Sequence, residues 1–211
     1  IYKKNLMQDR SGFIGHTEYL AEKDGSESLM ILMSKDLKVA TITTHIPISK
    51  VSKSLTRKKI SEKITILHKS LIRDFNIKNP KIAVSSLNPH SGEEGSIGNE
   101  EVKTIVPCIN NLKKMGMKIE GPLPADTLFY KKSLNKFDAR ICMYHDQALI
   151  PLKTLDFYGG INYTAGLSFV RTSPDHGTAF NLAGKNKANP KSFIYAINQA
   201  FIISKNRKIN E

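Results

Sequence analysis

KIAVSSLNPHSGEEGSIGNEEVKTIVPCINNL, residues 81–112, passes from a strand through a polar loop into a helix. Lys81 to Ser86 is a compact strand pattern, and residues 88–98 form a glycine-rich loop. Asn99 is suited to cap a helix. The apolar positions of that helix recur near a 3.6-residue period, and they are Val102, Ile105, Val106, Ile109 and Leu112. A strand followed by a loop and a helix is the repeating unit of layered α/β folds.

The same alternation continues on both sides of this stretch. Strand patterns cover residues 29–33, 39–43 and 139–143, with shorter extended pieces at 118–120, 162–164 and 168–171. Helical patterns cover residues 56–75 and 190–204, and the second should turn Phe193, Ile197 and Phe201 inward. The sequence therefore predicts an α/β fold with a largely parallel sheet, in which ligands bind at the carboxyl ends of strands. No repeat or linker divides the chain, so residues 1–211 are treated as one region.

Composition narrows the class of protein. The chain has 211 residues, of which 40% are apolar and 24% charged, an ordinary globular balance. It has no apolar run long enough to span a membrane and no signal peptide. The net charge is +13, but aromatic residues do not interleave with the lysines, so we expect attraction of anionic substrates rather than nucleic-acid binding. Cys108 and Cys142 lie in apolar surroundings, which suits a reducing cytoplasm.

Three histidines directly follow strands. His45, His90 and His145 could converge on one ion, because strand ends of a parallel sheet share an edge. Three imidazoles with an open position suit a catalytic zinc ion. Their spacing is not a local metal signature, so the alternative is three loop histidines bonded to neighbouring backbone. The glycines at 92, 95 and 98 are not a phosphate cradle, because Glu93 and Glu94 would repel a phosphate.

Other polar residues suit an anionic ligand. Lys153, Asn162 and Arg171 come from successive elements, and Lys and Arg bind phosphate and carboxylate groups. Surface ion pairing is the alternative for each of them. Gly15-His16-Thr17-Glu18 is a further polar cluster, in which Thr17 could instead cap a helix.

The loop from His176 to Pro190 mixes glycines, hydroxyl and amide side chains and a histidine. Such a loop can wrap a flat polar ligand. It resembles the adenine-binding loop of isocitrate and isopropylmalate dehydrogenases. This resemblance implies that the chain binds a nicotinamide dinucleotide although it lacks the usual glycine-rich fingerprint.

Six short segments in order resemble the 4-hydroxythreonine-4-phosphate dehydrogenase (PdxA) family. They are Gly15-His16-Thr17-Glu18, Thr43-Thr44-His45-Ile46-Pro47, Leu87-Asn88-Pro89-His90-Ser91-Gly92-Glu93, Gly121-Pro122-Leu123-Pro124-Ala125-Asp126-Thr127, Tyr144-His145-Asp146-Gln147 and Asp175-His176-Gly177-Thr178-Ala179. The resemblance covers nearly the whole chain but lacks the N-terminal third of the family, so we expect an N-terminally truncated version of the isopropylmalate-dehydrogenase-like layered α/β/α fold.

The resemblance implies an activity and a set of site residues. It implies oxidation of 4-phosphooxy-L-threonine by NAD, followed by decarboxylation to 3-amino-2-oxopropyl phosphate, in pyridoxal phosphate biosynthesis. It implies a cytoplasmic homodimer with active sites at the interface, and a divalent metal, with zinc preferred over magnesium or cobalt. The implied residues are His45, His90 and His145 for the metal, His16, Thr17, Lys153, Asn162 and Arg171 for substrate, His176, Gly177, Thr178, Asn181 and Asn189 for cofactor, and Lys153 and His145 for catalysis.

Two alternatives stay open. Related dehydrogenases often have an acid where this chain has Asn181, so NADP could replace NAD. The substrate could be 4-phosphothreonate or 4-phosphoerythronate, because a sister enzyme would share these motifs. A hypothesis of another class is an inactive, dimerising module that binds only metal or phosphate.

Overall fold

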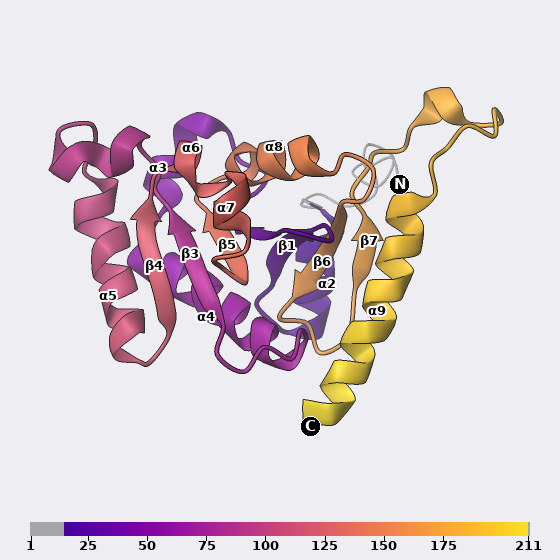
Figure 1. The fold of residues 1–211 in the computed structure, drawn as a ribbon, viewed down its shortest axis with the longest axis horizontal. Helices are drawn as coiled ribbons and strands as arrows, with labels where there is room; N and C mark the ends of the chain where they lie inside the picture. Colours follow the sequence, from indigo (N-terminus) through magenta and orange to yellow (C-terminus); the bar gives the residue numbers. More distant parts are fainter. Residues whose placement is uncertain (1–14, 211) are drawn as a thin grey trace.

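The computed structural model describes residues 15–210 and contains one seven-stranded sheet (Figure 1). The strand order is β4-β3-β5-β2-β1-β6-β7. The strands are β1 (Leu29–Met33), β2 (Lys38–Thr41), β3 (Lys81–Ser85), β4 (Lys118–Leu123), β5 (Ala139–Cys142), β6 (Ile161–Ala165) and β7 (Thr172–Pro174).

The sheet is mixed but mostly unidirectional. β2, β5, β3 and β4 are parallel neighbours, and β1 is antiparallel to both β2 and β6. Five strands therefore run in one direction, and only β1 and β7 oppose them. This confirms the predicted layered α/β fold with a largely parallel sheet.

Helices and short turns connect the strands. They are α2 (His16–Asp24), η1 (Ile48–Lys50), α3 (Val51–Ser54), α4 (Arg57–Arg73), η2 (Pro89–Gly95), η3 (Glu101–Ile105), α5 (Val106–Lys114), α6 (Ala125–Leu128), α7 (Lys131–Leu134), α8 (His145–Leu155), η4 (Phe180–Leu182) and α9 (Lys191–Asn210). No helix between residues 15 and 210 has both the length and the apolar composition needed to cross a bilayer.

Alternating side chains on the strands build two cores. Ile31 of β1 and Ile141 of β5 belong to the larger core, together with residues of α4, α5 and α9. Leu32 and Cys142, the next residues on those strands, face the opposite side and pack against α8. Since successive side chains of a strand point to opposite faces, this alternation produces a three-layer α/β/α arrangement.

A buried ionic cluster connects α4, β6 and α9. Asp74 is fully buried and accepts hydrogen bonds from Arg73 at 2.8 Å, the Tyr163 hydroxyl at 2.6 Å and Arg207 at 2.8 Å. Burial alone would raise the pKa of Asp74, but these three donors outweigh it and hold the pKa below its ordinary value. The same burial raises the pKa of Tyr163. The cluster holds α9 in one orientation against the sheet.

Asn99 lies at the start of the helix after β3, as predicted: Glu100 already has helical backbone angles, and the Asn99 carbonyl accepts a bond from the Lys103 amide at 2.9 Å. Two other details of the sequence reading were wrong. The first turn, Glu101–Ile105, is a π-helix, which rotates Val102 outward to 49% exposure. The strand expected at 168–171 begins instead at Thr172.

The orientation of the last helix was also predicted wrongly. Phe193, Ile197 and Phe201 are 56%, 54% and 73% exposed, whereas Ser192, Ala196, Ile203 and Arg207 are buried. The exposed side carries more large apolar residues than the buried side, which includes Ser192 and Arg207, so the apolar pattern indicated the wrong side. Small side chains face inward because α9 lies close to β6 and β7.

Candidate functional site

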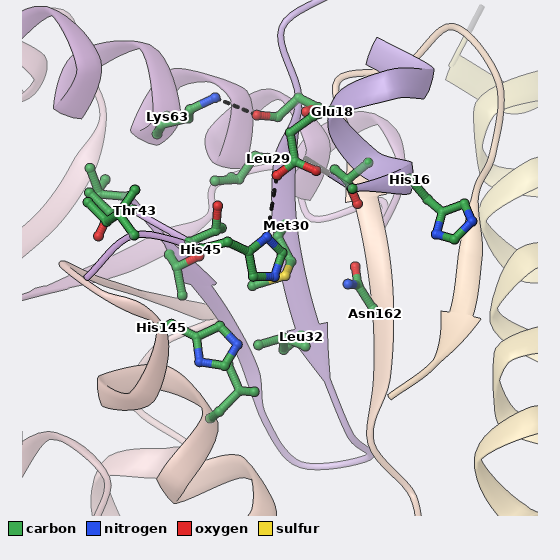
Figure 2. A pocket seen from close by; sticks show the side chains of 18 of the residues that line it. His16, Glu18, Leu29, Met30, Leu32, Thr43, His45, Lys63, His145 and Asn162 are labelled. Atoms are coloured by element: carbon green, nitrogen blue, oxygen red, sulfur yellow. Dashed lines mark hydrogen bonds and ion pairs between the residues drawn. The ribbon is translucent and has the colours of Figure 1, made fainter. Parts of the chain in front are cut away.

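A cavity of about 370 Å³ lies on the α8 side of the sheet, over β1 and β6 (Figure 2). Its walls come from the start of α2, the segment after β2, the first half of α4 and the start of α8. Two parallel strands, β2 and β5, deliver their following residues directly to it. The cavity therefore lies at the carboxyl ends of parallel strands, where the sequence analysis predicted a ligand site.

Backbone and side-chain bonds hold the two strand extensions together. The Thr43 amide and hydroxyl both donate to the Met143 carbonyl, at 3.2 and 2.7 Å. Gln147 is buried, accepts from the Met143 amide and donates to the Ser86 carbonyl, each at 2.8 Å. These bonds place His45 and His145 two residues beyond paired backbone, on neighbouring walls of the cavity.

The two histidines face one another across this corner. Their ring centroids are 5.9 Å apart. Glu18 Oε1 lies 3.7 Å from Nδ1 of His45 (Figure 2). Asp146 Oδ1 lies 2.7 Å from Nδ1 of His145. With a carboxylate beside each Nδ1, Nε2 is the ring nitrogen left to bind a ligand. The donor set therefore fits a divalent metal such as zinc.

His90 is not brought to these two histidines. It is exposed on η2 and lines neither the main cavity nor the adjoining cavity of about 250 Å³ beside His45 and His145. Within residues 15–210 no three metal-binding side chains form one group. The structure thus joins two of the three predicted metal ligands.

The segment that carries His90 has an uncommon backbone. Residues 90–94 all have positive φ, from 41° to 78°, a left-handed conformation that costs most residues about 1–2 kcal/mol each. Buried Glu101 stabilises the segment, because its carboxylate accepts from the Leu87 and Asn88 amides and from the Asn88 side chain, each at 2.8 Å. Strained backbone of this kind is concentrated at functional sites.

Arg171, Asn162 and Thr17 form the wall opposite the histidines. Arg171 donates to the Thr164 hydroxyl at 2.9 Å and approaches the Thr17 hydroxyl at 3.4 Å. Burial lowers the pKa of Arg171, and the nearby Glu18 carboxylate acts in the opposite direction. The guanidinium remains a cation and can bind a phosphate or carboxylate group. His16 lines the same wall.

Two buried side-chain oxygens at the cavity are not hydrogen-bonded to the described residues. Asn162 Oδ1 and Thr41 Oγ1 have no hydrogen-bond partner among the described residues. Buried polar atoms are normally satisfied, and unsatisfied ones in a cavity indicate where a ligand donates. A hydroxyl or ammonium group would satisfy them.

Lys153 lies just behind this wall and does not line the cavity. Its ammonium group is 2.9 Å from the Asp175 carboxylate and 2.5 Å from the Asp175 carbonyl. Asp175 itself lines the cavity, so of the Lys153–Asp175 ion pair only the aspartate borders the cavity directly.

The predicted cofactor residues lie apart from the cavity. His176, Gly177, Thr178 and Asn181 are exposed on the segment that projects beside α9 in Figure 1. Asn189 lines a separate, open depression between α8 and α9 and accepts a bond from the Lys191 amide at 2.9 Å. The structure therefore does not gather these five residues into one site.

Several cavity residues were missed by sequence reasoning. Lys59 and Lys63 line the cavity from α4, although their i, i+4 spacing looked like an ordinary solvated helix face. Glu18 and Asp175 were inside quoted motifs but were given no role. Glu18 lies two residues after His16 and Asp175 directly before His176, and this proximity to histidines was the available signal.

Fold and site together define a layered α/β protein with a polar small-molecule site that fits a metal ion and an anionic group. The model of the family described as pyridoxal phosphate biosynthetic protein PdxA matches residues 1–200, and the chain belongs to this family.

Comparison with individual relatives supports this family membership. The chain is 46% identical over 209 residues to a 4-hydroxythreonine-4-phosphate dehydrogenase of Shewanella frigidimarina, covering 99% of this chain and 64% of that protein. It is 51% identical over 204 residues to the enzyme of that name from Roseobacter denitrificans, covering 95% and 62%. The chain thus spans somewhat less than two thirds of the relatives it matches.

Solved structures support the fold. The 4-hydroxythreonine-4-phosphate dehydrogenase of Klebsiella pneumoniae superposes with a TM-score of 0.84 at 39% identity, over 96% of this chain and 62% of that one. A terephthalate 1,2-cis-dihydrodiol dehydrogenase from Burkholderia xenovorans superposes with a TM-score of 0.73 at 25% identity, over 89% and 60%.

Proposed function

We propose that this chain forms the substrate and metal site of a 4-hydroxythreonine-4-phosphate dehydrogenase of pyridoxal phosphate biosynthesis. The observation that carries the proposal is one cavity that combines the paired imidazoles of His45 and His145 with the half-buried guanidinium of Arg171. The names of the relatives supply the reaction. A cytoplasmic location is part of the proposal.

Each substrate group has a complementary residue. Arg171, with Lys59 and Lys63 on α4, can bind the phosphate and carboxylate of 4-phosphooxy-L-threonine. The oxygens of Asn162 and Thr41 can accept from its ammonium and hydroxyl groups. His16 and Thr17 line the same wall of the cavity. Their contacts would orient the substrate between the anion-binding side and the histidines.

The oxidation removes a hydride from the hydroxyl-bearing carbon and a proton from the hydroxyl oxygen, leaving a ketone. When bound, a divalent metal would acidify that hydroxyl and NAD or NADP would accept the hydride. His45 and His145 would hold the metal, with Glu18 and Asp146 orienting their rings. After loss of carbon dioxide, the carbon takes up a proton, and we propose the Lys153 ammonium, which is paired with Asp175, as the donor.

We propose that the third metal ligand, His90, comes from a second copy of the chain. Its distance from His45 and His145 supports this, as does the open cavity of about 250 Å³ that reaches both histidines from outside. The site would then be complete only in a homodimer. The loop 176–190 would contact the dinucleotide through His176, Gly177, Thr178, Asn181 and Asn189.

Binding and turnover test the proposal separately. In calorimetry with zinc present, 4-phosphooxy-L-threonine should bind this chain far more tightly than L-threonine does. Added NAD or NADP should then be reduced. Binding without reduction would favour the non-catalytic module, and equal affinity for both compounds would contradict the phosphate site.

One solved structure supports a second class of substrate for this fold. The Burkholderia xenovorans neighbour is named for a substrate without phosphate, so this fold accommodates different hydroxylated acids. Faster turnover of 4-phosphothreonate or 4-phosphoerythronate than of 4-phosphooxy-L-threonine would assign the chain to a sister enzyme. The free acceptor at Asn162 favours the amino compound only modestly, because a hydroxyl also donates to it.

A further inference from the structure

The side chain of Asn88 lies between two carboxylates at the start of the segment that carries His90. Its Nδ2 donates to Glu100 Oε2 and to Glu101 Oε2, each at 2.8 Å. These two glutamates are consecutive residues at the start of η3. An amide nitrogen carries two hydrogens and can serve two acceptors. Asn88 therefore gives one donor to each of two neighbouring anions, which would otherwise repel one another.

Glu100 extends these contacts to the segment that follows His45. Its Oε1 accepts from the Ser52 hydroxyl at 2.5 Å. The bonds from Ser52 and Asn88 hold the pKa of the Glu100 carboxyl below its ordinary value, so the group is an anion at neutral pH. Ser52 follows Val51, which lines the adjoining cavity beside the two paired histidines. One network thus joins the segment after His45 to the segment before His90.

The backbone leaves the Asn88 side chain little room to move. Gly98 has a φ of +131°, and a Cβ there would collide with the Asn88 amide nitrogen, so the loop backbone packs directly on this side chain. Pro89 follows, and its ring fixes its own φ. His90 comes next and begins the left-handed stretch. The position of Asn88 therefore sets the direction in which the chain leaves β3.

We propose that Asn88 is a positioning residue for His90. By holding its amide between Glu100 and Glu101, it fixes how the segment 90–94 projects from the sheet and so where the His90 imidazole points. Asn88 lines neither of the two cavities beside His45 and His145, so it acts through His90. The inference rests on the proposed function, in which His90 completes the metal site of a second copy.

Asn88→Asp tests the inference with almost no change of shape. The substitution replaces two N–H donors with a carboxylate oxygen, which Glu100 and Glu101 repel. Loss of a partner that orients a metal ligand typically weakens metal binding by about 10- to 100-fold, and we expect a loss of this size when zinc is titrated into the variant. Cobalt(II) in place of zinc gives a spectroscopic readout, because its visible absorption depends on coordination geometry. The account predicts a weaker absorption band for the variant.

A second substitution should restore part of the lost affinity. With Glu100→Gln added to Asn88→Asp, the new amide at position 100 can donate to the new carboxylate at position 88. One bond then returns with donor and acceptor exchanged, and the amide oxygen at position 100 can still accept from Ser52. Zinc binding by the double variant should lie between that of Asn88→Asp and that of the unsubstituted chain. No recovery would overturn the bridging role.

Asn210→Asp is the matched control. Asn210 Nδ2 also donates two bonds, to the Arg73 and Asn206 carbonyls at 3.1 and 2.9 Å, but it lies at the end of α9. This variant should bind zinc normally and show the unchanged cobalt absorption.

Hydrogen exchange of the metal-free protein separates positioning from folding. In Asn88→Asp, exchange should become faster in residues 87–98 and stay unchanged in β3 and β5. Faster exchange throughout the sheet would show a role in the fold and overturn the inference. Unchanged zinc affinity and cobalt absorption in Asn88→Asp would also overturn it and leave the metal site standing. An unsubstituted chain that binds no zinc would instead contradict the proposed metal site, and with it any positioning of His90 for metal.

Discussion

Arg171 is the residue on which anion recognition depends. It is half-buried and is held by the Thr164 hydroxyl within the cavity wall. Sequence reasoning identified it together with Asn162, Thr17 and His16, because short polar motifs at element ends stand out from the surrounding pattern. It could not identify Lys59 or Lys63, since only the packing of α4 shows which face of that helix borders the cavity.

Replacing Arg171 with methionine should weaken binding of 4-phosphooxy-L-threonine by roughly 10- to 100-fold, the loss expected for one charge-assisted bond of about 1.5–3 kcal/mol. Methionine fills much of the space, so zinc binding and the melting temperature should change little. Calorimetry with substrate and, separately, with zinc checks both parts. A variant that loses both together would show that Arg171 serves the fold rather than the ligand.

Asp74 is the residue on which α9 depends. Asp74→Asn leaves the buried guanidinium of Arg207 and the partly exposed guanidinium of Arg73 without their anion, and breaking a buried pair typically costs about 3–5 kcal/mol. Urea unfolding measures the loss. Glu120→Gln is the control, because the Glu120–Lys136 pair is largely exposed and should contribute less than about 1 kcal/mol.

The same carboxylate makes stability depend on pH. The folded pKa of Asp74 lies below its unfolded value, so its contribution is present above roughly pH 4 and is lost as the pH falls through the folded pKa. The native chain should therefore lose more unfolding free energy than Asp74→Asn does when urea titrations are repeated from neutral to strongly acidic pH. Parallel curves for the two proteins would exclude Asp74 as the source.

At the scale of elements, the left-handed segment at residues 90–94 is the least ordinary part of the fold. Gly92 has a φ of +78°, and a Cβ there would lie 2.7 Å from Glu101 Oε2 and 3.0 Å from the Gly98 carbonyl oxygen. The sequence indicated a loop holding His90, but nothing in it indicated five successive left-handed residues. That conformation depends on the buried Glu101 carboxylate, a contact made by a residue in the following helix.

Gly92→Ala should cost about 3 kcal/mol, combining a left-handed backbone penalty with an overpacked contact. Gly25→Ala is a matched control, since Gly25 has a φ of +65° and open space around its would-be Cβ. It should cost only about 1 kcal/mol. Thermal unfolding of both variants compares the two, and equal losses would show that the contact with Glu101 is not restrictive.

The buried strands and the helix with one clear apolar side were predicted well, but the orientation of α9 was not. The strands at 29–33 and 81–86 and the helix at 56–75 match β1, β3 and α4 within two residues at either end. The orientation of α9 was predicted wrongly because its buried side is less apolar than its exposed side. The buried side is fixed by bonds of Ser192 with Gly160, of Ala196 with Thr172 and of Arg207 with Asp74. No local pattern contains that information.

At the scale of the molecule, the proposed metal site requires a third ligand in addition to His45 and His145, because the described residues bring no third metal-binding side chain to them. The sequence analysis predicted three histidines as metal ligands and did not distinguish among them. It could not show that two lie within one chain and the third apart, because that division depends on assembly.

The central claim is a metal site completed by His90 of a second copy, and zinc content of mixed dimers tests it most directly. Differently tagged His45→Ala and His90→Ala chains would be co-expressed and the mixed dimer isolated through both tags. The account predicts half the zinc content of the unsubstituted dimer, because one of the two sites then combines intact His45 and His145 with an intact His90. Mixed dimers that bind no zinc, while the unsubstituted dimer does, would contradict it.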